Sequence, residues 1–170
     1  MQRERVKNKL KLNVNVMTWN VAVIDVPNDL IKMMVLSKIL DNADIFTFGV
    51  QECGIFKIKA WQKTVKTIAT SYGYYEIKSL EMCQMFLMVF VKTDLAPFVE
   101  NVEASYKAMG FANMIGNKGG LVISFDIMGF NFVFDKYFHL APIPPEKINI
   151  KSHIFQHIKS PGKSGALNIN

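Results

Sequence analysis

Cysteine, arginine and long apolar runs are all scarce in this chain. Its 170 residues include only Cys53 and Cys83, with no CxxC pair. A disulfide framework and a cysteine-rich zinc site are therefore excluded, and a reducing compartment is expected. The longest apolar stretch, Met82 to Val91, has ten residues, whereas a membrane-spanning helix needs roughly 20. The basic start is not followed by an apolar segment with a cleavage site, so we expect no secretory signal and a cytoplasmic location.

Only two of the twenty basic residues are arginine, so bidentate reading of guanine is not expected. Positive charge is concentrated at the two ends of the chain. Residues 1–11 carry +4 and residues 147–170 another +4, which leaves the body at −2 within a net charge of +6. These basic ends could bind anionic lipid or nucleic acid, or they could be solvated tails.

Half of the residues are apolar and 20% are charged, which excludes an extended disordered chain. The length corresponds to one domain, expected over 12–159, between a basic segment at 1–11 and a disordered tail at 160–170. The apolar periodicity predicts strands and helices. Strands are expected at 12–19, 44–50, 74–79, 84–92, 98–106, 120–126 and 130–138, the last two joined as a hairpin by a short turn around Met128 and Gly129. Helices are expected at 29–40, at 60–72 with Trp61 on its apolar face, and at 146–159. Two strand–helix units ahead of consecutive strands favour an α/β fold with helices on a mixed sheet.

Two polar side chains follow the first two predicted strands. Glu52 ends the apolar run before it, where a carboxylate can bind a hard cation such as Mg²⁺ or simply face water. Asn20 ends the first strand and can donate to a phosphate oxygen, support a metal-bound carboxylate, or only form a turn.

Two further candidates lie near later strands. Asn117 and Lys118 stand in a glycine-rich GNKGG stretch, where the backbone can approach an anion and the lysine adds a point charge. A solvated tight turn is the alternative. His139 follows the strand at 130–138 and suits acid–base work or phosphate contact, although a structural histidine is equally compatible. Together these residues indicate a metal-bound phosphate site at successive strand ends.

Taken in order, these stretches resemble the inositol polyphosphate 5-phosphatases of the endonuclease/exonuclease/phosphatase superfamily. The matching segments are TWNVA (18–22), DIFTFGVQE (44–52), MFLMVFVK (85–92), MIGNKGGLVISF (114–125) and FHLAP (138–142). TWN and QE are shared across the superfamily, which also includes nucleases. GNKGG followed by an apolar strand is the piece specific to the phosphoinositide branch.

The resemblance implies a four-layer α/β sandwich of two packed mixed sheets with outer helices, and Mg²⁺-dependent hydrolysis of an inositol 5-phosphate. On that pattern Glu52 binds the metal ion, and Asn20 supports the coordination shell of the metal. Asn117 and Lys118 line the phosphate-binding wall, and His139 contacts the scissile phosphate. The implied substrates are phosphoinositides or soluble inositol polyphosphates. The protein is expected to bind them in the cytoplasm or at the cytosolic face of membranes.

The chain departs from the family pattern in two ways. Tyr137 and Phe138 replace the small polar pair that usually precedes the strand-end histidine. The family's later GDLN-type and SDH-type motifs, which supply the general base and a closing histidine, are absent from the sequence. Neither Asp126 nor Asp135 stands in a GDLN context. We therefore expect about half of the sandwich, an apolar sheet face that needs a C-terminal half or partner chain, and no turnover by these residues alone.

Two other functions remain open at this point. A catalytically dead paralogue would bind phosphoinositide or a partner through the surviving phosphate wall around Lys118. A superfamily nuclease is the third possibility, and both GNKGG and the near-neutral body disfavour it.

Overall fold

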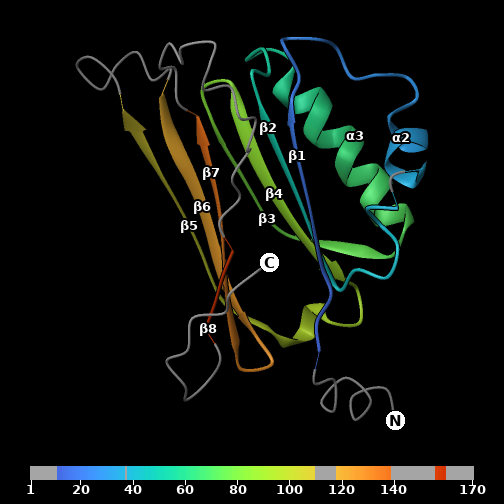
Figure 1. The fold of residues 1–170 in the computed structure, drawn as a ribbon, viewed down its shortest axis with the longest axis vertical. Coiled ribbons are helices and arrows are strands. Elements are labelled where there is room, and N and C mark those ends of the chain that lie inside the picture. Colours follow the sequence, from blue (N-terminus) through green and yellow to red (C-terminus); the bar gives the residue numbers. More distant parts are fainter. Residues whose placement is uncertain (1–10, 37, 110–117, 139–155, 160–170) are drawn as a thin grey trace, which may run out of the picture.

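Residues 11–36, 38–109, 118–138 and 156–159 are described by the computed structural model. They form two four-stranded sheets that pack face to face, with helices on the outer side of the first sheet (Figure 1). The expected α/β fold with two packed sheets is confirmed. No helix in this described part is long and apolar enough to cross a membrane.

The first sheet is mixed, with strand order β1-β2-β4-β3. Its strands are β1 (Val14–Asn20), β2 (Ile45–Gln51), β3 (Tyr74–Met82) and β4 (Met85–Lys92). Only β1 and β2 run parallel, because a crossover through helix α2 (Leu30–Leu36) joins them. Helix α3 (Ile58–Ser71) links β2 to β3. The parallel pair brings the ends of β1 and β2 to one edge of the sheet.

The second sheet is an antiparallel meander in the order β5-β6-β7-β8. A short 3₁₀ helix, η1 (Ala96–Phe98), leads into β5 (Val99–Met109), followed by β6 (Lys118–Ile127), β7 (Phe130–Phe138) and β8 (Gln156–Lys159). Ile127 pairs with Phe130 across the turn at Met128 and Gly129, which both have positive φ. That two-residue hairpin was predicted from the sequence and is confirmed.

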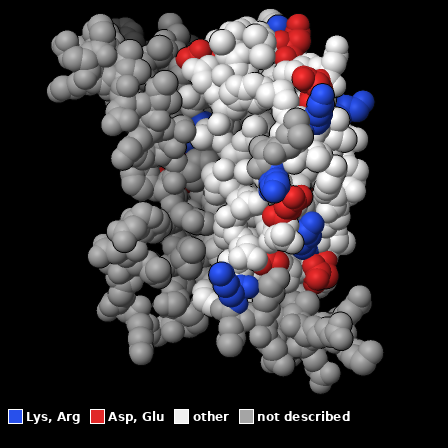
Figure 2. All heavy atoms as spheres, turned by 45° about the vertical axis from the view of Figure 1, so that its right-hand side comes forward, with Lys and Arg blue, Asp and Glu red and all other residues white. Residues whose placement is uncertain are grey.

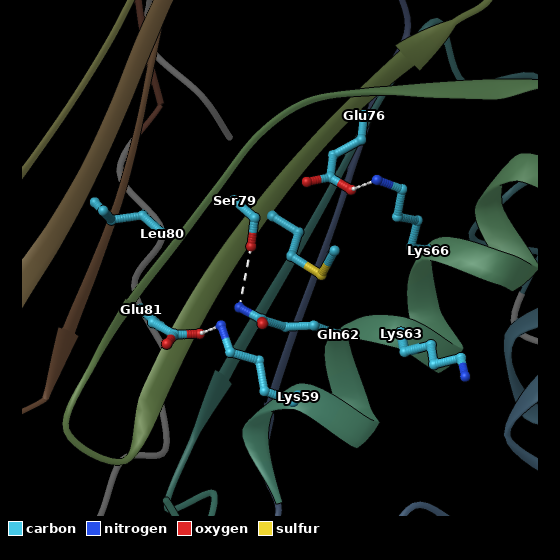
Figure 3. A pocket seen from close by; sticks show the side chains of 9 residues that line it. Lys59, Gln62, Lys63, Lys66, Glu76, Ser79, Leu80 and Glu81 are labelled. Carbon is cyan, nitrogen blue, oxygen red and sulfur yellow. Dashed lines mark hydrogen bonds and ion pairs between the residues drawn. The ribbon is translucent and has the colours of Figure 1, made fainter.

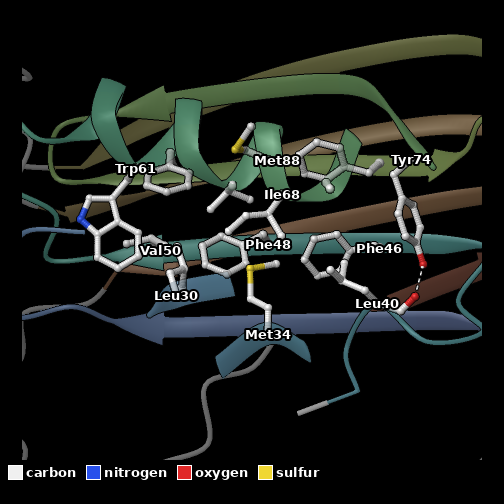
Figure 4. Packing of buried hydrophobic residues seen from close by; sticks show 14 of the residues in the cluster. Leu30, Met34, Leu40, Phe46, Phe48, Val50, Trp61, Ile68, Tyr74 and Met88 are labelled. Atoms are coloured by element: carbon white, nitrogen blue, oxygen red, sulfur yellow. Dashed lines mark hydrogen bonds between the residues drawn. The ribbon is translucent and has the colours of Figure 1, made fainter. Parts of the chain in front are cut away.

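Two apolar clusters hold the layers together. Phe46 and Phe48 of β2 pack under the helices, with Trp61 of α3 and Met34 of α2 (Figure 4). Side chains on the opposite face of β2 and β4 meet β6 and β7 in the second cluster, between the sheets. The strand β2 is buried on both faces, which explains its nearly continuous apolar sequence.

Two of the predicted helices differ in the structure. The helix expected over 29–40 ends at Leu36, and a turn covers 38–40. The helix expected over 146–159 is wrong at its end, because Gln156–Lys159 form strand β8. Pairing with Asn131–Phe134 of β7 satisfies the backbone there and overrides the helical spacing. Residues 146–155 lie outside the described part.

Candidate active site

Asn20 and Glu52 lie at the carboxyl ends of neighbouring parallel strands, as the sequence predicted. In the register of β1 and β2, Asn20 is the partner of Gln51, so Glu52 follows one residue beyond the pair. Asn20 is exposed, and Glu52 is half-buried. This edge of an α/β sheet is where ligands usually bind.

Backbone hydrogen bonds join the turns that follow β1 and β2. The Val21 N–H donates to the Gln51 carbonyl at 3.0 Å, and the Val23 N–H donates to the Glu52 carbonyl at 2.7 Å. Glu52 has φ 55° and Val23 φ 60°, a left-handed conformation that costs about 1–3 kcal/mol at a non-glycine residue. The paired turns hold Glu52 in a strained, defined position at the end of the sheet.

The orientation of the Asn20 amide follows from its hydrogen bond. Its Oδ1 accepts the N–H of Ala22 at 3.0 Å. The Nδ2 group therefore carries the remaining donors of this side chain. Asn20 is suited to donate to a phosphate or carboxylate oxygen and is less suited to ligate a cation.

The turn after β1 is also fixed from the side of α3. Trp61 Nε1 donates to the Ile24 carbonyl at 3.3 Å, and the Trp61 ring meets Trp19 edge to face, with 5.5 Å between centroids. Lys57 Nζ donates to the Val23 carbonyl at 2.9 Å and pairs with Asp25 at 2.9 Å. The sequence predicted Trp61 only as part of an apolar helix face, so its contact with the site was missed.

Lys136 is a second residue near the site that the sequence analysis did not identify. It lies on the inner face of β7, is only 2% exposed, and donates to Thr18 Oγ1 of β1. A Cβ at Gly49 of β2 would approach its Cδ to 3.3 Å, so its stem crosses that glycine. Burial lowers the pKa of Lys136 to about 8. In the sequence FNFVFDKYF of β7, alternate residues face the core, and Lys136 falls on the same face as Phe132 and Phe134. That alternation could have indicated a buried lysine.

The Lys136–Thr18 contact aligns the two sheets at the site. Thr18 and Lys136 each stand two residues before the end of their strand. Gly119, next to the start of β6, pairs with Phe138 at the end of β7. The ends of β1 and β7 and the start of β6 therefore meet at the same edge of the sandwich.

The side chains of five residues named in the sequence analysis of the site are not described. Asn117 and His139 lie outside the described residues. Lys118 begins β6 and Tyr137 and Phe138 end β7, but only their backbones are described. The register places the backbone of Lys118 beside the last residues of β7.

Other charged residues form local ion pairs between α3 and β3. A cavity of about 510 Å³ lies between α3 and β3 (Figure 3). Lys59 pairs with Glu81 at 2.9 Å and Lys66 with Glu76 at 3.0 Å across it. Basic and acidic side chains also alternate over the face shown in Figure 2. The pairing favours a structural role for the cavity.

The donor set at the edge fits Mg²⁺ better than a softer metal. Within the described ranges, no three His, Cys, Asp or Glu residues gather into a metal-binding group. Mg²⁺ is commonly held by one or two carboxylates, with waters and substrate phosphates completing its shell. Cys53 follows Glu52 but is buried, and burial raises the pKa of its thiol to about 11. Glu52 is the carboxylate that directly follows a strand of the parallel pair, and it could hold a cation there.

Comparison with known proteins agrees with this geometry. The sequence profile of Endonuclease/Exonuclease/phosphatase family 2 matches residues 17–159. Inositol polyphosphate 5-phosphatase K of Mus musculus is 26% identical over 151 residues, which cover 84% of this chain and 32% of that protein. Inositol-1,4,5-trisphosphate 5-phosphatase 1 of Schizosaccharomyces pombe is 30% identical over 100 residues, covering 49% of this chain and 9% of that protein.

Solved structures show the same fold. The 5-phosphatase domain of Spsynaptojanin, in complex with inositol (1,4)-bisphosphate and calcium, has a TM-score of 0.66 and 23% identity, over 84% of this chain and 45% of that one. Cimex nitrophorin, in a ferrous NO complex, has a TM-score of 0.63 and 22% identity, over 75% of this chain and 46% of that one. The fold alone thus does not determine the chemistry.

The chain spans about a third of the mouse phosphatase and less than half of the solved 5-phosphatase domain. The profile nevertheless covers most of the chain itself, from β1 to β8. The chain belongs to the endonuclease/exonuclease/phosphatase family 2.

Proposed function

We propose that the chain is the metal- and phosphate-binding part of a Mg²⁺-dependent phosphatase that removes the 5-phosphate of phosphoinositides or soluble inositol polyphosphates. Glu52 binds the cation. Asn20 donates to the phosphate or to the metal-bound carboxylate, Asn117 and Lys118 line the phosphate wall, and His139 contacts the scissile phosphate. The supporting observation is the register that brings Asn20 and Glu52 to one edge, opposite the end of β7.

Each described residue has a distinct task in this proposal. When bound, the cation polarises a phosphoryl oxygen and neutralises its charge. Glu52 fixes where the cation sits, because the bonded turns and its left-handed backbone define its position. The Nδ2 group of Asn20 gives a preorganised donor for developing negative charge.

Turnover needs a general base in addition to these groups. Asp126, the carboxylate of β6, already accepts from Asn101 and Asn131 at 2.7 Å each, and these bonds lower its pKa. It lies at the far end of β6, beside the hairpin turn. We expect these 170 residues to bind Mg²⁺ and inositol phosphate without measurable phosphate release. Binding without release is also what a catalytically dead paralogue would show.

Mg²⁺ binding tests the role of Glu52. By titration calorimetry, the wild-type chain is expected to bind Mg²⁺ at one site, and Glu52→Gln to weaken that binding at least tenfold, because the amide removes the anionic ligand. Glu76→Gln is the matched control, since Glu76 is a carboxylate paired with Lys66 towards the opposite end of the sheet, level with Phe46 and Asn15. Equal Mg²⁺ affinities for the wild type and Glu52→Gln would refute the metal assignment.

Phosphate release tests the remaining part of the proposal. Mg²⁺-dependent release from inositol 1,4,5-trisphosphate that disappears in Glu52→Gln would confirm the metal ligand. The same result would contradict the expectation that this chain is inactive by itself.

Apolar side chains beside the candidate site support a lipid-borne substrate. Phe56 is 94% exposed and Ile55 57% in the turn after β2, and Val23 and Ile24 are 48% and 45% exposed in the turn after β1. A fully exposed phenylalanine is unusual on a surface that meets only water. We propose that this apolar rim touches the cytosolic face of a membrane while the headgroup reaches the site.

Vesicle binding tests the apolar rim. Phe56→Ser is expected to weaken binding to phosphatidylcholine vesicles that contain phosphatidylinositol 4,5-bisphosphate by about tenfold, from the lost burial of one aromatic side chain. Tyr106→Ser, at a 64% exposed position on β5, is the control and should leave binding unchanged. If both variants bind like the wild type in a sedimentation assay, the rim does not contact lipid.

A further inference from the structure

Lys136 is an ammonium group buried between two apolar sheets. It is 2% exposed, and it donates a hydrogen bond to the neutral hydroxyl of Thr18. A buried charge is costly unless it is paired with an opposite charge and fully hydrogen-bonded. An ammonium has three donors, and a single hydroxyl uses one of them. The local contacts therefore do not explain why a lysine occupies this position.

The surrounding layer offers no neutralising carboxylate among the described residues. Leu121 of β6 is the strand partner of Lys136, and Gly49 and Thr47 lie on the facing side of β2. Thr47 Oγ1 is itself buried and lacks a hydrogen-bond partner. Away from the edge, the inward residues of β1, β4 and β6, such as Val16, Leu87 and Ile123, are apolar. Towards the edge, the inward faces of β1 and β2 continue with the neutral amides Asn20 and Gln51. Among the residues that the structure describes, no carboxylate compensates the positive charge of Lys136.

The uncompensated charge lies just below the candidate site. Thr18 precedes Asn20 by two residues on β1, a rise of about 7 Å along a strand. Gly49 precedes Glu52 by three residues on β2. In the apolar layer the field of the ammonium is weakly screened, so it extends to the edge where a phosphate would bind.

We propose that Lys136 is a positioning residue for the phosphate site, which holds the end of β1 through Thr18 and supplies positive potential beneath the bound phosphate. The inference rests on the proposed phosphate-binding function. Two unit charges about 8 Å apart at the effective dielectric of a protein interact strongly enough to change affinity by about tenfold or more. Phosphate binding should therefore depend on whether Lys136 is protonated.

The test is calorimetric binding of inositol 1,4,5-trisphosphate with Mg²⁺ present, at about pH 7 and about pH 9, on either side of the lowered pKa. Four proteins are compared: the wild type, Lys136→Met, Lys136→Arg and Lys63→Met. Lys63 is an exposed lysine of α3 and controls for loss of one positive charge. The ionisation of the ligand is common to all four proteins and cancels in their ratios.

At pH 7, Lys136→Met is expected to bind about tenfold more weakly than the wild type, and the difference should largely vanish at pH 9. Lys136→Arg keeps its charge at both pH values, so it should bind like the wild type at pH 7 and more tightly at pH 9. Lys63→Met should follow the wild type at both values. Thermal melts confirm that each variant is folded.

Three results would overturn the inference. If Lys136→Met shows the affinity and pH profile of the wild type, Lys136 does not act on the phosphate, although the proposed function stands. If Lys136→Met is weaker by the same factor at both pH values, its effect is structural. If the wild type does not bind and Glu52→Gln changes nothing, the proposed function fails and the inference fails with it.

Discussion

Replacement of Trp61 by alanine is expected to lower the free energy of unfolding by about 3–5 kcal/mol. The Trp61 side chain is completely buried under the first sheet, and its ring meets Trp19 of β1 edge to face. The substitution leaves a large cavity between α3 and β1 and deletes the bond to the Ile24 carbonyl. Helix packing and the turn beside the site should weaken together.

Urea denaturation at equilibrium measures this change. Trp61→Phe is the matched variant, because it keeps most of the apolar volume and loses only the indole N–H and part of the ring. Its cost should be well below that of alanine. If alanine and phenylalanine destabilise the chain by the same small amount, Trp61 does not connect the helix to the site in the way described.

Replacement of Lys136 by methionine is expected to stabilise the chain at neutral pH, by about 3 kcal/mol. In the folded protein burial lowers the pKa of Lys136 to about 8, whereas an unfolded lysine titrates near pH 10.4. Below pH 8 both states carry the proton, so the whole cost of burying the charge is present. Methionine has a similar shape and no charge to bury.

The gain should disappear as the pH rises. Between about pH 8 and pH 10 the folded state has released the proton while the unfolded state retains it, so wild-type stability increases with pH. The advantage of Lys136→Met therefore shrinks over this interval. Urea midpoints at several pH values, with Lys63→Met as the reference, give the difference directly. An advantage of constant size, or none at pH 7, would show that the lysine is solvated.

The fold was largely predictable because most of its strands show a clear apolar pattern, either alternating or continuous. The continuous run of β2 indicated a strand buried on both faces, and the hairpin of β6 and β7 followed from a two-residue turn. Strand β8 was not predictable in the same way. Its four residues carry no clear alternation, and the long-range ladder with β7 determines their conformation.

The candidate site was predictable where single residues end strands. Asn20 and Glu52 stood out because they follow apolar runs, and the parallel register then brought them together. Lys136 was missed because its position depends on how the two sheets pack against each other, which is not a local property of β7. The left-handed backbone of Glu52 depends likewise on a bond from Val23, 29 residues earlier in the chain.

The most direct test is a crystal structure of the chain with Mg²⁺ and inositol 1,4,5-trisphosphate. We predict a cation about 2.1 Å from a Glu52 carboxylate oxygen, with a phosphate that accepts from Asn20 Nδ2, at the carboxyl ends of β1 and β2. A cation and phosphate bound elsewhere, with the Glu52 carboxylate free of metal, would contradict the assignment of this edge as the active site.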